Sequence, residues 1–110
     1  MKTIFVVTTI QFGMKKLKVG PNKGKKILGI VDKRTIGWFP KLETAQNCVD
    51  RNWGDIYEAG QYSWAVVEEI VYGVYPPTNE WWYRWDSKKG KYRPSPKLKQ
   101  YEKVTNFAMG

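Results

Sequence analysis

The fold is decided by the segment "PKLETAQNCVDRNW", residues 40 to 53. Its apolar residues recur at helical spacing and form a single stripe: Leu42, Ala45, Val49 and Trp53. Pro40 suits the first helical turn, because proline lacks the N–H that would be unpaired there. Gly54 suits the stop at the other end. The segment therefore predicts one main helix with a single face to bury.

The segments around this helix are typical of β-strands. They are rich in β-branched and aromatic residues and lie at residues 3–12, 33–39, 64–76, 80–86 and 91–95. The last two flank "SKKG", which predicts a hairpin turn. We therefore expect one α+β domain, residues 1–110, with a small antiparallel sheet and the helix packed on one of its faces.

Two further segments belong to this domain. Residues 13–33 are rich in lysine and contain the turn-forming sequence "GPNKG". They predict either a basic β-hairpin, with residues 15–19 against 26–31, or a loop inserted in the domain. The C-terminal tail, residues 97–110, ends in the apolar "NFAMG", so we expect it to dock on the body.

The positive charge is concentrated in two parts of the chain. The formal net charge is +9, and eight of the 19 basic residues lie in 14–34 and eight more in 84–103. Residues 35–83, between them, hold two basic and seven acidic residues. Such segregation favours an anionic partner, such as nucleic acid, a nucleotide or an acidic protein surface, over charge that serves solubility alone.

The aromatic segment "EWWYRWDSKKGKYRPSPK", residues 80 to 97, combines rings with basic side chains. Alternate residues of a strand face opposite sides, and we expect Trp81, Tyr83 and Trp85 to face the core. Trp82 and Arg84 then share the other side. There the indole can stack on a base while the guanidinium holds a phosphate. The alternative is that Trp82 packs under the tail or at a subunit interface.

The segment "GDIYEAGQYSW", residues 54 to 64, lies at the entrance to an apolar strand. Polar and aromatic groups at such an entrance often line a pocket, which makes Tyr57 and Tyr62 candidate ligand contacts. Asp55 could instead cap a local turn. Asp55 and Glu58 are also the best-placed pair of carboxylates for acid–base chemistry.

The residues needed for several kinds of catalysis are missing from the sequence. The chain has no histidine and one cysteine, Cys48, so a serine or cysteine nucleophile lacks its base and zinc lacks a ligand set. The acidic residues do not match a calcium loop, and "GPNKGKK" lacks the Walker spacing. We therefore expect a binding protein rather than an enzyme, with no metal and no cofactor.

The N-terminal apolar run predicts a strand rather than a signal peptide, because Thr8 and Thr9 interrupt it. No apolar window approaches the length of a membrane span. A single cysteine rules out an internal disulfide and indicates a reducing compartment. We expect a cytoplasmic protein that makes no membrane contact.

Several motifs together produce a resemblance. They are the strand "RTIGW", the "LE" pair in the helix, the turn "DIYE", the strand "VEE", the aromatic "WWY" and the terminal "NFAMG". Over residues 34–110 the chain resembles a group of small, mostly uncharacterised proteins of phages, prophages and their bacterial hosts. The lysine-rich segment departs from the group's shorter version. The group has no settled activity, so the resemblance assigns no residue roles; it implies a phage setting, the host cytoplasm and possible action against host defence.

These observations predict a small basic phage-type oligomer that sequesters an anionic nucleotide. The ligand class is a cyclic nucleotide or an ADP-ribose-type immune messenger, and the subunits share the site because 110 residues leave little room for an enclosed pocket. The candidate ligand-binding residues are Trp82, Arg84, Arg93, Tyr92, Arg34, Tyr57 and Tyr62. The alternatives are sequence-independent nucleic-acid binding and inhibition of a host defence nuclease, as anti-CRISPR proteins do.

Overall fold

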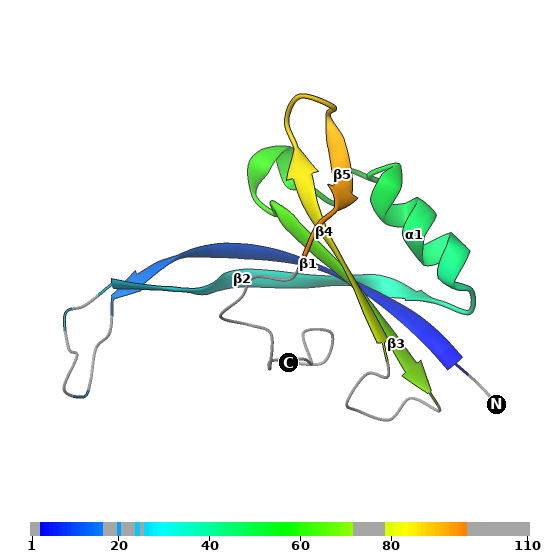
Figure 1. Cartoon of the computed structure of the whole chain (residues 1–110), viewed down its shortest axis with the longest axis horizontal. Coiled ribbons are helices and arrows are strands. Elements are labelled where there is room, and N and C mark those ends of the chain that lie inside the picture. Colours follow the sequence, from blue (N-terminus) through cyan, green and yellow to red (C-terminus); the bar gives the residue numbers. More distant parts are fainter. Residues whose placement is uncertain (1–2, 17–19, 21–23, 25, 72–78, 97–110) are drawn as a thin grey trace.

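The chain folds into a five-stranded antiparallel sheet with one helix against one face (Figure 1). The computed structural model describes residues 3–16, 20, 24, 26–71 and 79–96. The elements are β1 (Thr3–Lys16), β2 (Lys26–Phe39), α1 (Leu42–Asp50), the short 3₁₀ helix η1 (Glu58–Gly60), β3 (Trp64–Val71), β4 (Asn79–Asp86) and β5 (Lys91–Pro94). The strand order is β2-β1-β3-β4-β5. The predicted α+β fold is confirmed.

Strands β1 and β2 are longer than predicted, because both continue into the lysine-rich segment. They pair from Phe5 opposite Phe39 to Lys16 opposite Lys26. The described ends of this segment are thus paired strands rather than a loop. The residues of the predicted "GPNKG" turn lie mostly outside the described part of the chain, as do the C-terminal tail and residues 72–76 of the third predicted strand.

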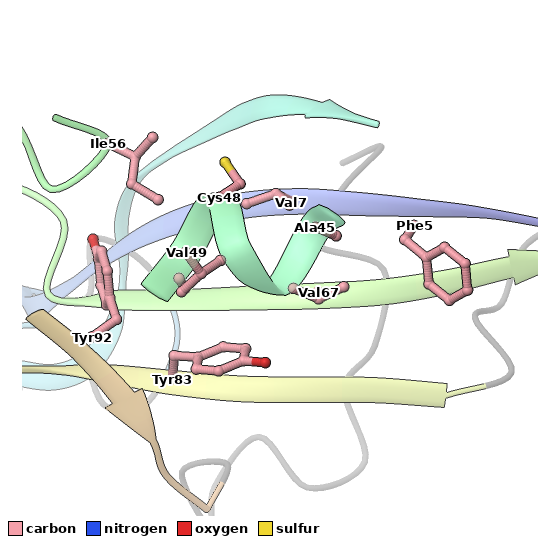
Figure 2. Close-up of a cluster of buried hydrophobic side chains, with 10 residues drawn as sticks. Phe5, Val7, Ala45, Cys48, Val49, Ile56, Val67, Tyr83 and Tyr92 are labelled. Carbon is pink, nitrogen blue, oxygen red and sulfur yellow. The ribbon is translucent and has the colours of Figure 1, made fainter. Parts of the chain in front are cut away.

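The main core lies between α1 and the sheet. Buried side chains from β1, β3, β4, β5 and α1 meet there, and Figure 2 shows them converging beneath the helix. They are Phe5, Val7, Ala45, Cys48, Val49, Ile56, Ala65, Val67, Tyr83 and Tyr92. Trp81 and Trp85 are partly buried against the same cluster, so the predicted orientation of alternate residues in β4 is correct.

Helix α1 ends earlier than the apolar spacing predicts. The chain turns after Asp50, where the Trp53 N–H donates to the Cys48 carbonyl and Asn52 adopts a left-handed φ of 48°. Trp53 therefore lies beyond the helix and is not part of its buried stripe. It remains 43% exposed, and its ring meets the edge of Phe39 with centroids 6.3 Å apart.

The face of the sheet away from α1 is apolar as well. One cluster contains Ile10, Trp64, Val66 and Trp82, with Phe12 packed against it. A second contains Val6 and Ile70, with Ile4 beside them. Strand β3 is accordingly buried along most of its length, although it carries two glutamates, of which Glu68 is fully buried. Within the described ranges, no helix is long and apolar enough to cross a membrane.

Candidate functional site

Arg84 and Arg93 lie directly opposite each other on the β4–β5 hairpin. The turn between the strands fixes this register: the Asp86 carboxylate accepts the N–H groups of Lys88 and Lys89, and Gly90 adopts a φ of 68°. That left-handed conformation suits glycine at the end of a short hairpin loop. Both arginines are exposed. The hairpin therefore presents two guanidinium groups on the face away from α1.

The arginines continue a row of cross-strand neighbours that spans the sheet. The row contains Lys33 of β2, Ile10 of β1, Trp64 of β3, Arg84 of β4 and Arg93 of β5. Directly opposed residues of antiparallel strands point to the same side of a sheet. The row thus has an apolar centre, a lysine at one edge and two arginines at the other.

Trp64 helps to orient Arg84. The Arg84 guanidinium carbon lies 5.3 Å from the centre of the Trp64 ring, within cation–π range. Trp64 is itself buried and fixed by edge-to-face contacts with Phe12 and Trp82, at centroid distances of 5.9 and 6.2 Å. The ring is consequently a rigid support for the guanidinium of Arg84.

The two arginines concentrate positive charge, and neither forms an ion pair with another described residue. Among the described residues, the ion pairs are Arg34 with Glu58 and Lys91 with Asp50, and neither includes Arg84 or Arg93. Like charges directly opposed across two strands destabilise the pairing by roughly 0.2–1 kcal/mol. An anion bound between the guanidinium groups would remove that repulsion.

An open groove lies beside the arginines. Its volume is about 450 Å³, and its lining is Arg84, Trp85, Asp86, Ser87, Lys88, Arg93, Pro94 and Ser95. Three of these side chains are cationic and one is acidic. The Asp86 carboxylate already accepts two backbone N–H groups of the turn. The groove can therefore accept an anion, and the Ser87 hydroxyl on its lining is a further neutral donor.

Trp82 cannot serve as the predicted stacking platform in this structure. Only 6% of it is exposed, because it packs with Ile10, Trp64 and Val66 in the cluster on the face away from α1. Its indole N–H donates to the Glu80 carboxylate at 3.1 Å. The prediction placed Trp82 on the correct face of β4, but at Trp82 that face is buried and not exposed to a ligand.

Four other predicted residues gather on the helix-side face, away from the opposed arginines. Tyr57 lies flat on Trp85, with centroids 3.8 Å apart and 9° between the rings. The edge of Tyr92 meets both rings, and its hydroxyl donates to the Tyr62 carbonyl oxygen. Tyr92 is 1% exposed, and this burial raises its pKa. The group is a packed support for the hairpin rather than an open pocket.

Polar contacts fix the remaining members of this group. The Tyr62 hydroxyl donates to Asp32 at 2.8 Å, and this hydrogen bond is the main cause of the raised pKa of Tyr62. Arg34 donates to Glu58 at 2.5 Å. The predicted phosphate contact Arg34 and the predicted carboxylate Glu58 are thus paired with each other. Arg34 lies on the opposite face of the sheet from Arg84.

The structure brings Arg84 and Arg93 together on the face away from α1, and the other predicted site residues except Trp82 gather on the helix-side face. Trp64, Lys33 and Lys88 were missed. The pairing of the two arginines could have been predicted from the sequence. Arg84 and Arg93 are each three residues from the "SKKG" turn, and residues equally far from a hairpin turn lie opposite each other on the two strands. The contribution of Trp64 depends on the register of β3 against β4, which no local pattern specifies.

Metal-binding groups do not assemble in the part of the chain that the structure describes. There, no three or more acidic or cysteine side chains gather at one point. Cys48 is buried in the main core, and desolvation raises the pKa of its thiol. Asp55 accepts a hydrogen bond from Asn52, consistent with its predicted role in a local turn.

Comparisons with known proteins assign neither a family nor a function to this chain. A scan against protein-family models, a search of curated proteins and a search of solved structures each gave no match. The functional argument therefore depends on the residues and geometry of this chain.

Proposed function

We propose that this protein is a non-enzymatic binding protein that captures an anionic nucleotide, with a phosphate held between Arg84 and Arg93. The observation that carries the proposal is the direct opposition of these two exposed arginines, with no carboxylate paired to either among the described residues. Guanidinium groups present paired N–H donors that match two phosphate oxygens at once. A bound phosphate also relieves the repulsion between the two side chains.

The base of the nucleotide is expected to stack on Arg84. A guanidinium plane is a stacking surface for a base, as an aromatic ring is. Trp64 supports Arg84 from within the sheet, so a base on the outer side would complete a layered arrangement of indole, guanidinium and base. Arg84 thereby takes over the stacking role that the sequence suggested for Trp82.

Sequestration also fits an oligomer. The groove beside the arginines is open to solvent, and a second subunit placed over it would shield the ligand from water. Together with the resemblance to phage-borne proteins, this supports a counter-defence role, in which the protein lowers the free concentration of an immune messenger in the infected cell.

The proposal is tested by titrating cyclic mono- and dinucleotides, ADP-ribose derivatives and inorganic phosphate against the protein. A ligand at about 100 times its Kd stabilises the native state by about 2.7 kcal/mol, and so raises the Tm by on the order of 10 °C. Arg93→Gln is expected to weaken binding roughly 10- to 100-fold, from the usual strength of a hydrogen bond to a charged group. Arg51→Gln, an exposed arginine after α1, is the matched control. If no nucleotide on the panel changes the Tm, the proposal is wrong.

A further inference from the structure

The groove beside Arg84 and Arg93 is also lined by a third cationic side chain, that of Lys88. Lys88 lies in the turn that joins β4 to β5 (Figure 1), four residues along the chain from Arg84. The arginines therefore line the groove from the two strands, whereas Lys88 lines it from the tip of the hairpin. One phosphate held between the arginines leaves Lys88 without a role.

The position of Lys88 is fixed by the hydrogen bonds of its own turn. Its backbone N–H donates to the Asp86 carboxylate at 2.9 Å, and the Lys89 N–H donates to the same oxygen at 3.2 Å. The Gly90 N–H closes the turn by donating to the Asp86 carbonyl oxygen at 2.8 Å. The Lys88 side chain therefore starts from a defined point beside the groove.

The other two lysines of the hairpin are directed elsewhere. Lys91 points to α1, where its Nζ lies 3.9 Å from the Asp50 carboxylate. Lys89 is exposed but lies outside the groove lining in the described hairpin. Lys88 takes part in neither of the two ion pairs formed among the described residues. It is therefore the lysine of this hairpin that is placed to contact a ligand in the groove.

The charge of the groove matches a ligand with two negative charges. Its described lining contains three cations, Arg84, Arg93 and Lys88, and one carboxylate, Asp86, which leaves a net charge of +2. A cyclic mononucleotide carries a single negative charge and would compensate only part of it. A diphosphate that joins two sugars carries one negative charge on each phosphate, so it compensates the charge of the groove fully.

The three cations are near enough to contact two phosphates that are bonded to each other. Arg84 and Arg93 are directly opposed on neighbouring strands, which lie about 4.8 Å apart. From Arg84 to Asp86, after which the turn begins, two residues of strand span about 7 Å. All three cationic side chains line one groove of about 450 Å³. A diphosphate fits this arrangement better than a cyclic dinucleotide, in which sugars separate the two phosphates.

We propose that the ligand of this groove is a nucleoside diphosphate ester, the chemical class of ADP-ribose, with one phosphate between Arg84 and Arg93 and the other on Lys88. The arginines hold two oxygens of the first phosphate at once, and the lysine binds the second as a point charge. This inference rests on the proposed function, because it takes the arginine pair as a phosphate site. It goes further by selecting a diphosphate over a cyclic nucleotide and by assigning Lys88 to the second phosphate.

The test measures affinities by isothermal titration calorimetry at a single ionic strength. Inorganic phosphate is compared with pyrophosphate, and AMP with ADP-ribose, while a cyclic dinucleotide supplies two phosphates that are not bonded to each other. The variants are Lys88→Gln and Arg93→Gln. The matched control is Lys89→Gln, which removes the same charge from the next residue of the same turn, outside the groove lining.

The wild-type protein should bind pyrophosphate and ADP-ribose roughly 10-fold or more tightly than phosphate and AMP, from the usual strength of a hydrogen bond to a charged group. Lys88→Gln should remove this advantage and leave the affinities for phosphate and AMP close to those of the wild type. Arg93→Gln should weaken the binding of all four probes, because it removes half of the pair that holds the first phosphate. Lys89→Gln should leave all four affinities close to those of the wild type.

Three results would overturn the inference: pyrophosphate and ADP-ribose that bind no more tightly than phosphate and AMP, equal effects of Lys88→Gln and Lys89→Gln, or a cyclic dinucleotide that binds more tightly than ADP-ribose. If AMP or the cyclic dinucleotide still binds and Arg93→Gln weakens that binding, the proposed function stands and only the choice of a diphosphate is wrong. If no probe binds the wild-type protein, the proposed function is wrong and this inference falls with it.

Discussion

The Tyr57 ring lies flat against the Trp85 ring, with centroids 3.8 Å apart and 9° between their planes. This contact joins the segment that follows α1 to the strand that carries Arg84. Tyr92, opposite Trp85 on β5, closes the group through ring-edge contacts. The aromatic residues of the 54–64 segment therefore set the position of the hairpin, while the exposed arginines of the same hairpin face the other way.

Removing the Tyr57 ring should loosen the hairpin. Tyr57→Ala is expected to lower the free energy of unfolding by about 2 kcal/mol, because an aromatic pair contributes about 0.5–1.5 kcal/mol beyond its buried area. Tyr57→Phe keeps the stacked ring and should change stability by less than about 0.5 kcal/mol. Urea denaturation of both variants measures the difference. Equal losses in the two variants would show that the hydroxyl, and not the stack, is what matters.

Stability should fall in alkaline solution. The pKa values of Tyr62 and Tyr92 are raised above the ordinary value of 10.0, by the hydrogen bond to Asp32 and by burial respectively. Above pH 10 the unfolded chain releases these protons while the native state retains them, so the free energy of unfolding decreases as pH rises. Their stabilisation is fully present below pH 10.

Tyr92→Phe provides the check on this pH dependence. The variant loses the hydroxyl that donates to the Tyr62 carbonyl, so it should be less stable near pH 7 by about 1 kcal/mol. Its free energy of unfolding should then decline less steeply than that of the wild type above pH 10. Parallel curves for the two proteins, measured by urea denaturation from pH 8 to 11, would rule out Tyr92 as a source of the decline.

The fold was largely predictable because its signals are local. The helical stripe of Leu42, Ala45 and Val49 and the strand-forming runs each act over a few residues, and they gave the α+β class. The boundaries were less predictable. Helix α1 ends at Asp50 because Asn52 and Gly54 adopt left-handed conformations, so Trp53 fell outside the buried stripe despite its helical spacing.

The candidate site was only half predictable for a different physical reason. Alternation along β4 correctly separated Trp82 and Arg84 from Trp81, Tyr83 and Trp85, but alternation does not say whether a face is buried. Burial of Trp82 depends on Ile10 and Val66, which reach it through the pairing of β1, β3 and β4. That register is a long-range property, and it is also what places Trp64 beneath Arg84.

Backbone strain in the segment after α1 gives a third prediction. Ala59 adopts φ 50° and ψ 36°, a left-handed conformation that costs an alanine roughly 1 kcal/mol relative to glycine. Because Ala59 is exposed, Ala59→Gly loses no packing and should raise the free energy of unfolding by up to about 1 kcal/mol. Ala45→Gly, in the buried face of α1, is the contrasting control and should be destabilising. A loss of stability in Ala59→Gly would contradict the strain argument.

The opposed arginines make a prediction in which stability and binding move in opposite directions. Arg93→Glu replaces a repulsive cross-strand pair with an attractive one and leaves Arg84 over Trp64, so the free energy of unfolding should increase by roughly 0.2–1 kcal/mol. The same change puts a carboxylate where the phosphate is proposed to bind, and nucleotide binding should disappear. Chemical denaturation and the nucleotide titration measure the two effects on one variant, and Arg93→Gln, which only removes charge, should fall between it and the wild type in stability. A destabilised Arg93→Glu protein would mean that Arg93 already has an anionic neighbour in the native state, and the case for a phosphate site at this hairpin would then fail.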